Sequence, residues 1–307
     1  MQEHDLTGAA HHVPTSDNRS LRISVVLISL YFVFEAAVAI STGSLAMLAD
    51  AAHELSTAIA ISMSLVAMKY SSKPPTPERT YGYLRTEIVA ALFNGLLLFG
   101  MAGFIFYRGV IRLYNPVEVP SGPMFIVAIG GIWLEIASLI IMYRSQKENL
   151  NIRGSFWHVI NAFLGSIAII IAATFIAAAK IYIADSIAGI IFGFVLIYGA
   201  FGLVRDSLRI LIDATPRDID MQAIEADIRA LSGVVDVHHM HAWTITSGLK
   251  ALSTHVTIDD FTVAEEILQT IKIKVSDKWG FALSTIQLET SSLDEHESKR
   301  LEFRPDD

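Results

Sequence analysis

The chain has no cysteine, so disulfide bonds and thiolate metal ligands are excluded, and any metal ion must be held by histidine, carboxylate or backbone oxygen. It is also poor in charge. Charged residues make up 18% of its 307 residues, apolar residues make up 52%, and the mean hydropathy is positive. This balance excludes an ordinary soluble domain and indicates a polytopic membrane protein. A formal net charge of −8 gives no general attraction to nucleic acid.

The first twenty residues lack the apolar core of a cleaved signal peptide. They are polar and hold His4, His11 and His12. We expect residues 1–20 to form a disordered cytosolic tail.

Six apolar runs follow, each long enough to cross a bilayer as a helix. They are Leu21–Ile40, Ser44–Lys69, Thr86–Tyr114, Gly122–Tyr143, Ser155–Ala178 and Ile181–Leu203. The sequence therefore predicts an all-α membrane domain of six transmembrane helices over residues 21–212.

The basic residues of the loops predict the orientation of these spans, because cytosolic loops are enriched in Lys and Arg. Those on one side are Arg19, Arg22, Lys69, Lys73, Arg79, Arg85, Arg144, Lys147, Arg153, Arg205 and Arg209. Only Arg108, Arg112 and Lys180 fall on the other side. Both termini are therefore expected in the cytosol.

Two of the apolar runs each contain a histidine, His53 in the second and His158 in the fifth. An ionisable side chain in hydrocarbon is costly, so such residues are usually functional. Two imidazoles on separate helices can bind one cation, and neutral imidazole suits Zn²⁺ and other late transition metals. The alternative is that each histidine only hydrogen-bonds a neighbouring helix.

After Asp213 the pattern changes to that of a small α+β domain over residues 213–290. The predicted order αββαβ is that of a metallochaperone or ferredoxin-like domain. Its expected elements are a helix at Met221–Leu231, strands at Val234–Thr246 and Leu249–Ile258, a helix at Phe261–Trp279 and a strand at Ala282–Glu289. Residues 291–307 form a charged tail.

Several local strings carry a family resemblance. They are Gly43–His53, Arg79–Tyr83, Glu87–Ala91, Glu148–Gly154, Ala184–Ser186, His241–Gly248 and Thr285–Glu289. With the six spans and the αββαβ domain, these strings resemble the bacterial zinc- and cadmium-exporting branch of the cation diffusion facilitator family. The resemblance runs from about Leu21 to Glu289.

The resemblance implies that the chain is an antiporter and not an enzyme. It implies a homodimer in the lipid of the bacterial inner membrane that exports Zn²⁺, Cd²⁺, Co²⁺ or another divalent cation in exchange for protons.

The transport site departs from the family pattern of His-x-x-x-Asp on the second and fifth spans. Four residues make about one helical turn, so each pair shares a face and the four side chains can form a tetrahedral site. Here Thr57 and Ala162 stand at the two aspartate positions, after His53 and His158. Two neutral imidazoles bring no negative charge, so the charge of a divalent cation would remain largely uncompensated in the low dielectric of the membrane.

Nearby carboxylates are candidates for the missing charge. Asp50 lies three residues before His53 on nearly the same helix face, and Glu135 lies inside the fourth span, where relatives usually carry an amide. Glu54 follows His53 directly and points about a quarter-turn away from the helix face of His53. Glu35 and Asp185 also lie within spans. The family carries Glu35, Asp50 and Asp185 at matching positions, outside the four His and Asp residues of its transport site. The alternative for Glu135 is a protonated side chain bonded to a neighbouring helix.

The family also often binds metal in its cytosolic domain through strand histidines, of which His238, His239, His241 and His255 remain here. His239 and His241 are expected to alternate on one strand face, with His255 joining from the hairpin partner. A further family histidine is replaced by Leu283. The alternative is a solvated cluster of histidines.

Three interpretations remain open. The chain is a working metal exporter with a degenerate site, a non-conducting or regulatory relative, or a protein whose metal site was disabled by design.

Overall fold

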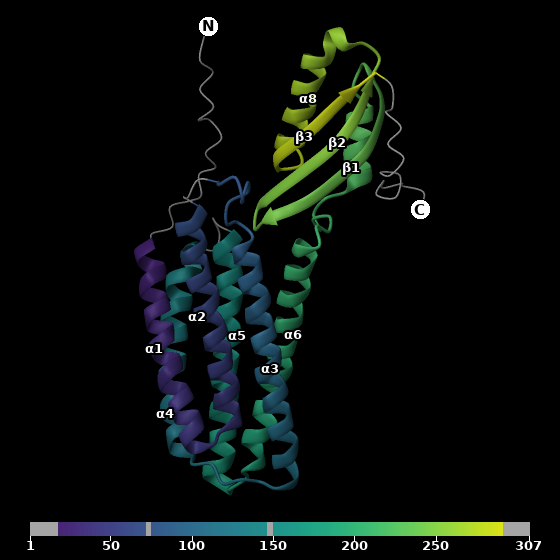
Figure 1. Ribbon diagram of the computed structural model, residues 1–307. Helices are drawn as coiled ribbons and strands as arrows, with labels where there is room; N and C mark the ends of the chain where they lie inside the picture. Colours follow the sequence, from purple (N-terminus) through teal and green to yellow (C-terminus); the bar gives the residue numbers. More distant parts are fainter. Residues whose placement is uncertain (1–17, 72–74, 146–149, 291–307) are drawn as a thin grey trace. The chain divides into compact units, whose positions relative to one another are not determined.

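A computed structural model describes residues 18–71, 75–145 and 150–290 (Figure 1). The chain separates into two compact units, with boundaries after Ser72, Leu92 and Leu203. Residues 1–17 of the predicted N-terminal tail and the charged C-terminal tail lie outside the described residues, whereas residues 18–20, predicted as part of the tail, are helical.

Each apolar run forms one long helix, and most of each helix lies in the first unit. The helices are α1 (Asn18–Thr42), α2 (Leu45–Ser71), α3 (Thr86–Tyr114), α4 (Ser121–Ser145), α5 (Leu150–Ala179) and α6 (Ile183–Leu211). Four contain a described stretch long and apolar enough to cross a membrane: Arg22–Thr42, Thr86–Tyr114, Ala162–Ala179 and Ile183–Leu211. The corresponding stretch of α4, Ser121–Ile136, is shorter. Helix α2 is continuous, but the polar residues Asp50, His53 and Glu54 interrupt its apolar sequence.

Small side chains allow the helices of this unit to pack closely. Ala39, Ala46, Ala128 and Ala172, from α1, α2, α4 and α5, are buried in one cluster. A second cluster joins α2, α3 and α6. Large apolar side chains on the outer surface remain exposed, as a lipid-facing surface requires. They include Leu30, Phe93, Trp133, Ile191 and Tyr198.

The second unit contains a three-stranded sheet in the order β1-β2-β3. Its elements are α7 (Met221–Arg229), β1 (Val234–Thr246), β2 (Leu249–Ile258), the 3₁₀ turn η2 (Phe261–Val263), α8 (Ala264–Asp277) and β3 (Phe281–Glu289). β1 and β2 pair antiparallel, whereas β2 and β3 pair parallel. The element order is the αββαβ order predicted from the sequence.

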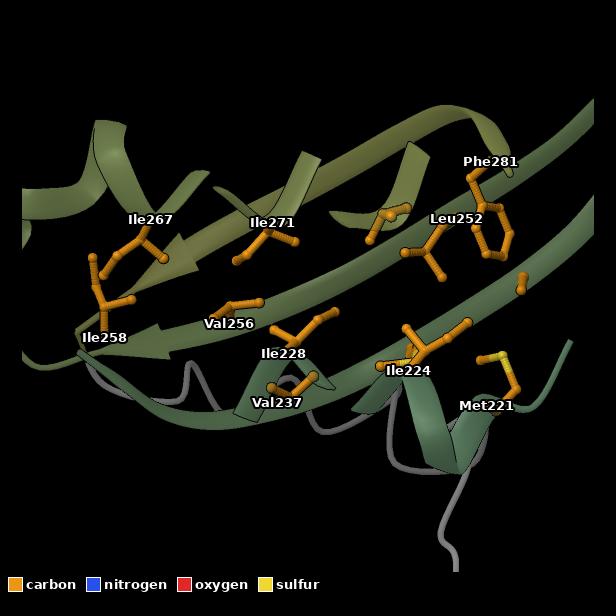
Figure 2. Close-up of a cluster of buried hydrophobic side chains, with 13 residues drawn as sticks. Met221, Ile224, Ile228, Val237, Leu252, Val256, Ile258, Ile267, Ile271 and Phe281 are labelled. Carbon is orange, nitrogen blue, oxygen red and sulfur yellow. The ribbon is translucent and has the colours of Figure 1, made fainter. Parts of the chain in front are cut away.

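One apolar core holds this α+β unit together (Figure 2). Helix α7 contributes Ile224 and Ile228, and α8 contributes Ile271, at the spacing that aligns apolar side chains on one helix face. They pack with Leu252 and Val256, two of the core residues of β2. The rigid core fixes the sheet on which the histidines lie.

Candidate metal centres

Helix α2 places His53 in the interior of the membrane unit, where its residue is only 8% exposed. Its ring packs against Phe192 on α6 in a T-shaped arrangement, with the ring centroids 6.0 Å apart. The hydroxyl of Thr57, at one of the replaced aspartate positions, donates a hydrogen bond of 3.0 Å to the carbonyl oxygen of His53. Thr57 thus satisfies its polar group on its own helix and contributes no negative charge.

The other predicted histidine, His158, lies on α5, but the side chains of residues 150–161 lie outside the described residues. Helices α2 and α5 contact one another. Ala162, at the second replaced position, is buried. The convergence of His53 and His158 on one ion stays a prediction.

Helix α5 also approaches the carboxylates proposed to replace the lost charge. The Ser166 hydroxyl donates a hydrogen bond of 2.9 Å to Oε1 of Glu135 on α4. Gly165 faces Asp50, and a β-carbon built at Gly165 would lie 2.6 Å from Oδ1 of Asp50. Both Asp50 and Glu135 are buried, so the structure places both candidates predicted from the sequence in the interior of the helical bundle, beside α5.

Asp185 has a different environment, at the beginning of α2. Its carboxylate accepts hydrogen bonds from Ser44 Oγ at 2.5 Å and from the backbone N–H groups of Leu45 at 2.8 Å and Ala46 at 3.2 Å. The Arg112 guanidinium lies 3.9 Å away and also donates to the carbonyl oxygen of Gly43. Asp185 therefore caps α2 from α6, a structural role consistent with an acidic group at a helix N-terminus.

In the second unit, His238, His255 and Glu289 bring one ligand atom each within 4.8 Å of one another. It is the only such group of three among the described His, Asp and Glu residues. His238 lies directly across the antiparallel pair from His255. Glu289 Oε1 lies 2.9 Å from Nδ1 of His255, and its Oε2 lies 3.5 Å from Nε2 of His238. Two imidazoles and a carboxylate are a donor set that suits Zn²⁺.

A β-bulge changes the expected arrangement of the other histidines. The β1–β2 register shifts between His238 and His241, and His239 adopts a left-handed backbone conformation with φ of 50°. The predicted alternation of His239 and His241 is therefore interrupted. The His239 ring instead lies 5.3 Å, centroid to centroid, from the rings of both His238 and His255. A non-glycine residue in this conformation is uncommon and often marks a functional position.

His241 is not among the three converging residues but lies near the group. Partial burial lowers the pKa of the His241 imidazole below its ordinary value, and the neighbouring His239 and His255 lower it further. A neutral imidazole is the form that binds metal.

Sequence reasoning missed Glu289 as a ligand candidate. It ends the Thr285–Glu289 string, but only the parallel pairing of β3 with β2, in which Thr257 faces Glu289, brings its carboxylate beside His255. Leu283, at the position of the absent family histidine, pairs with Ala251 farther along the same strand.

The first unit has helices long and apolar enough to cross a membrane, and it buries histidine and carboxylate side chains. The α+β domain that follows carries a histidine–glutamate cluster. Together these features define a membrane protein that handles metal ions. Comparison with known proteins specifies the class. Residues 21–212 match the cation efflux transmembrane domain, and residues 216–291 match the cytoplasmic domain of cation efflux proteins. The chain belongs to the cation efflux family, a family of metal ion transporters also called cation diffusion facilitators.

Similar proteins are found in several bacteria. The chain is 36% identical to the cadmium, cobalt and zinc/H⁺–K⁺ antiporter of Bacillus subtilis over 92% of both chains. It is 34% identical to the metal cation efflux system protein CzcD of Cupriavidus metallidurans over 92% of this chain and 90% of that protein. It is 30% identical to the zinc transporter ZitB of Escherichia coli over 93% of this chain and 92% of that protein.

Proposed function

We propose that the chain exports divalent metal ions, foremost Zn²⁺, from the cytosol in exchange for protons. The observation that carries this proposal is the buried imidazole of His53 on α2, inside a domain that matches the cation efflux transmembrane domain. The similarity to relatives named as zinc, cadmium and cobalt transporters supports Cd²⁺ and Co²⁺ as further substrates.

The transport site in this proposal comprises His53 of α2 and His158 of α5. Asp50 and Glu135 supply negative charge in place of the aspartates that Thr57 and Ala162 replace. Because imidazole binds a metal ion only when it is neutral, protons and metal compete for the same nitrogen atoms. This competition couples metal exit to proton entry.

All six long helices cross the membrane in this proposal, and both termini lie in the cytosol of a bacterial cell, as the bias of loop Lys and Arg residues predicts. The domain boundaries are those predicted above: a tail at 1–20, a transport domain at 21–212, a cytosolic domain at 213–290 and a tail at 291–307. The cytosolic domain joins two copies into a homodimer, and its cluster of His238, His255 and Glu289 binds a regulatory metal ion. His239, whose ring lies beside this cluster, and His241 are the further ligand candidates.

A non-conducting, regulatory relative is the second candidate, and it is favoured by one observation. Thr57 and Ala162 remove both carboxylates from the family quartet. Such a protein would retain the fold and the dimer without transporting metal.

Zinc flux into proteoliposomes separates these candidates. Purified protein is reconstituted with an acidic interior, Zn²⁺ is added outside, and a trapped fluorescent indicator reports its entry. The proposal predicts uptake that collapses when the pH gradient is dissipated and that is lost in His53→Ala. His12→Ala, which removes a histidine from the N-terminal tail, is the control and should transport normally. A folded dimer that moves none of Zn²⁺, Cd²⁺ and Co²⁺ would establish the non-conducting alternative.

A further inference from the structure

An apolar groove lies between α2 and α3 in the membrane unit. It has a volume of about 420 Å³, within the range of sites that hold small ligands. Every residue that lines it is apolar or glycine. These residues are Leu48 of α2 and, from α3, Leu96, Leu97, Gly100, Met101, Phe104 and Ile105. The lining suits a hydrocarbon chain.

The groove is open to the outside of the helical unit. A β-carbon at Gly100 would meet no atom within 4 Å. Ile105 is buried, whereas Leu97 is 42% and Phe104 52% exposed. The stretch Thr86–Tyr114 of α3 is long and apolar enough to cross a membrane, so the surface around the groove faces the hydrocarbon of the bilayer. Acyl chains of lipids are therefore the molecules that reach the groove.

A cationic side chain follows the groove along the same face of α3. Arg108 comes four positions after Phe104, which is about one helical turn, so the two side chains share a helix face. Arg108 is exposed, although it lies within the apolar stretch. A charge in a membrane span is costly unless it has a partner or reaches the headgroup region, which a long arginine side chain near a helix end can do.

The described part of the chain provides no carboxylate for Arg108. None of the ion pairs among the described residues involves it. Arg112, one turn farther along α3, is buried, lies 3.9 Å from Asp185 and donates to the carbonyl oxygen of Gly43. Like charges one turn apart disfavour each other, so an anion beside Arg108 would be stabilising. Phosphate suits this position, because a guanidinium group binds it through two parallel hydrogen bonds.

We propose that the groove and Arg108 together form a binding site for an anionic phospholipid. One acyl chain lies between α2 and α3, and the phosphate of the headgroup pairs with Arg108. The second positive charge at Arg112 favours a headgroup with net negative charge over a zwitterionic one. The site goes beyond the proposed transport function, because His53, His158, Asp50 and Glu135 do not line it.

Photo-crosslinking of lipids tests the site in a bilayer. Full-length protein is reconstituted into phosphatidylcholine vesicles that contain a small fraction of phosphatidylglycerol with a photoreactive diazirine in its acyl chain. A parallel sample contains the same fraction of phosphatidylcholine with the same diazirine. After irradiation, mass spectrometry of the peptides locates the attached lipid.

Two variants separate the headgroup contact from the acyl-chain contact. Arg108→Gln removes the charge, and Gly100→Leu fills the groove. Lys180→Gln, which removes an exposed cation after α5, is the control for the first. Gly130→Leu is the control for the second, because Gly130 is an exposed glycine of α4 whose β-carbon would also meet no atom within 4 Å.

The proposal predicts that the phosphatidylglycerol probe labels residues 96–105 at least about fivefold more than the phosphatidylcholine probe, and that Arg108→Gln removes this preference. Gly100→Leu should lower the labelling by both probes, whereas the two controls should be labelled as the wild type is. Equal labelling by the two probes overturns the proposal, as does a preference that persists in Arg108→Gln. Absence of lipid on residues 96–105, expected if a second copy of the chain covers the groove, also overturns it. Should Gly100→Leu not fold, the exposed Arg108→Gln decides.

Discussion

Asp185 of α6 accepts a hydrogen bond of 2.8 Å from the backbone N–H of Leu45, the first residue of α2. Eight residues farther along α2 lies His53, whose ring meets Phe192 of α6. Between the two contacts, Gly189 packs against the backbone of Leu45 so closely that a β-carbon would clash at 2.9 Å. One face of α6 therefore holds α2, and with it the candidate ligand, in position.

Asp185→Ala should destabilise the membrane unit. The substitution removes the cap of α2 and leaves the buried Arg112 guanidinium without its carboxylate partner, so the free energy of unfolding should fall by at least about 2 kcal/mol. Thermal unfolding in detergent measures the loss. The control is Asp206→Ala, which removes an exposed ion pair with Arg217 and should cost no more than about 1 kcal/mol. Equal effects of the two substitutions would refute the capping role.

Gly165→Ala should impair metal transport, because its new β-carbon would lie 2.6 Å from Asp50 Oδ1 and 2.9 Å from the Phe192 ring. We expect at least about a tenfold loss of zinc flux, since small displacements of binding groups are costly. Gly103→Ala on α3 meets no atom within 4 Å and should leave flux unchanged. Wild-type flux in Gly165→Ala would show that the position of Asp50 is unimportant.

Glu289→Gln should weaken zinc binding by the cytosolic domain. It removes the only carboxylate of the described three-residue cluster, and loss of one charge-assisted contact corresponds to roughly 10- to 100-fold in affinity. Isothermal titration of the full-length dimer provides the measurement. Glu266→Gln, on the exposed side of α8, is a matched control that should bind as the wild type does.

The stability of the cytosolic domain should decline in mild acid through His241. Burial lowers the pKa of its imidazole in the folded state below 6.5, so the unfolded chain binds a proton more readily. The free energy of unfolding therefore decreases as the pH falls below 6.5. It stops decreasing once the pH is below the lowered pKa of the folded state. Denaturant unfolding of the metal-free protein across this range should show a smaller decline in His241→Asn. An identical pH dependence in the variant would exclude His241 as its source.

Local patterns predicted much of the architecture. The strands predicted at Val234–Thr246 and Leu249–Ile258 have the same bounds in the structure as β1 and β2, and α7 begins at Met221 as predicted. The predicted helix from Phe261 begins instead with the 3₁₀ turn η2, because Asp260 accepts a hydrogen bond from the Thr262 N–H and α8 starts only at Ala264.

The sites were less accessible to sequence reasoning because they depend on pairing between distant elements. Glu289 reaches His255 only through a parallel strand pairing, and the left-handed conformation of His239 has no sequence signal, since it is not glycine. Glu35 and Glu135 lie 100 positions apart in the sequence and interact only because α1 packs against α4. Their individual positions inside apolar runs could be read from the sequence, but their mutual proximity could not.

The most direct test of the central claim is zinc flux before and after the family carboxylates are restored. If the chain is a metal exporter with a degenerate site, Thr57→Asp combined with Ala162→Asp should return two charge-assisted contacts to the histidine pair. Zinc affinity should then rise by roughly 10²–10⁴, with contributions taken as additive, and proton-driven uptake into proteoliposomes should increase. Wild-type protein that transports zinc with an affinity that this double substitution does not improve would contradict the account.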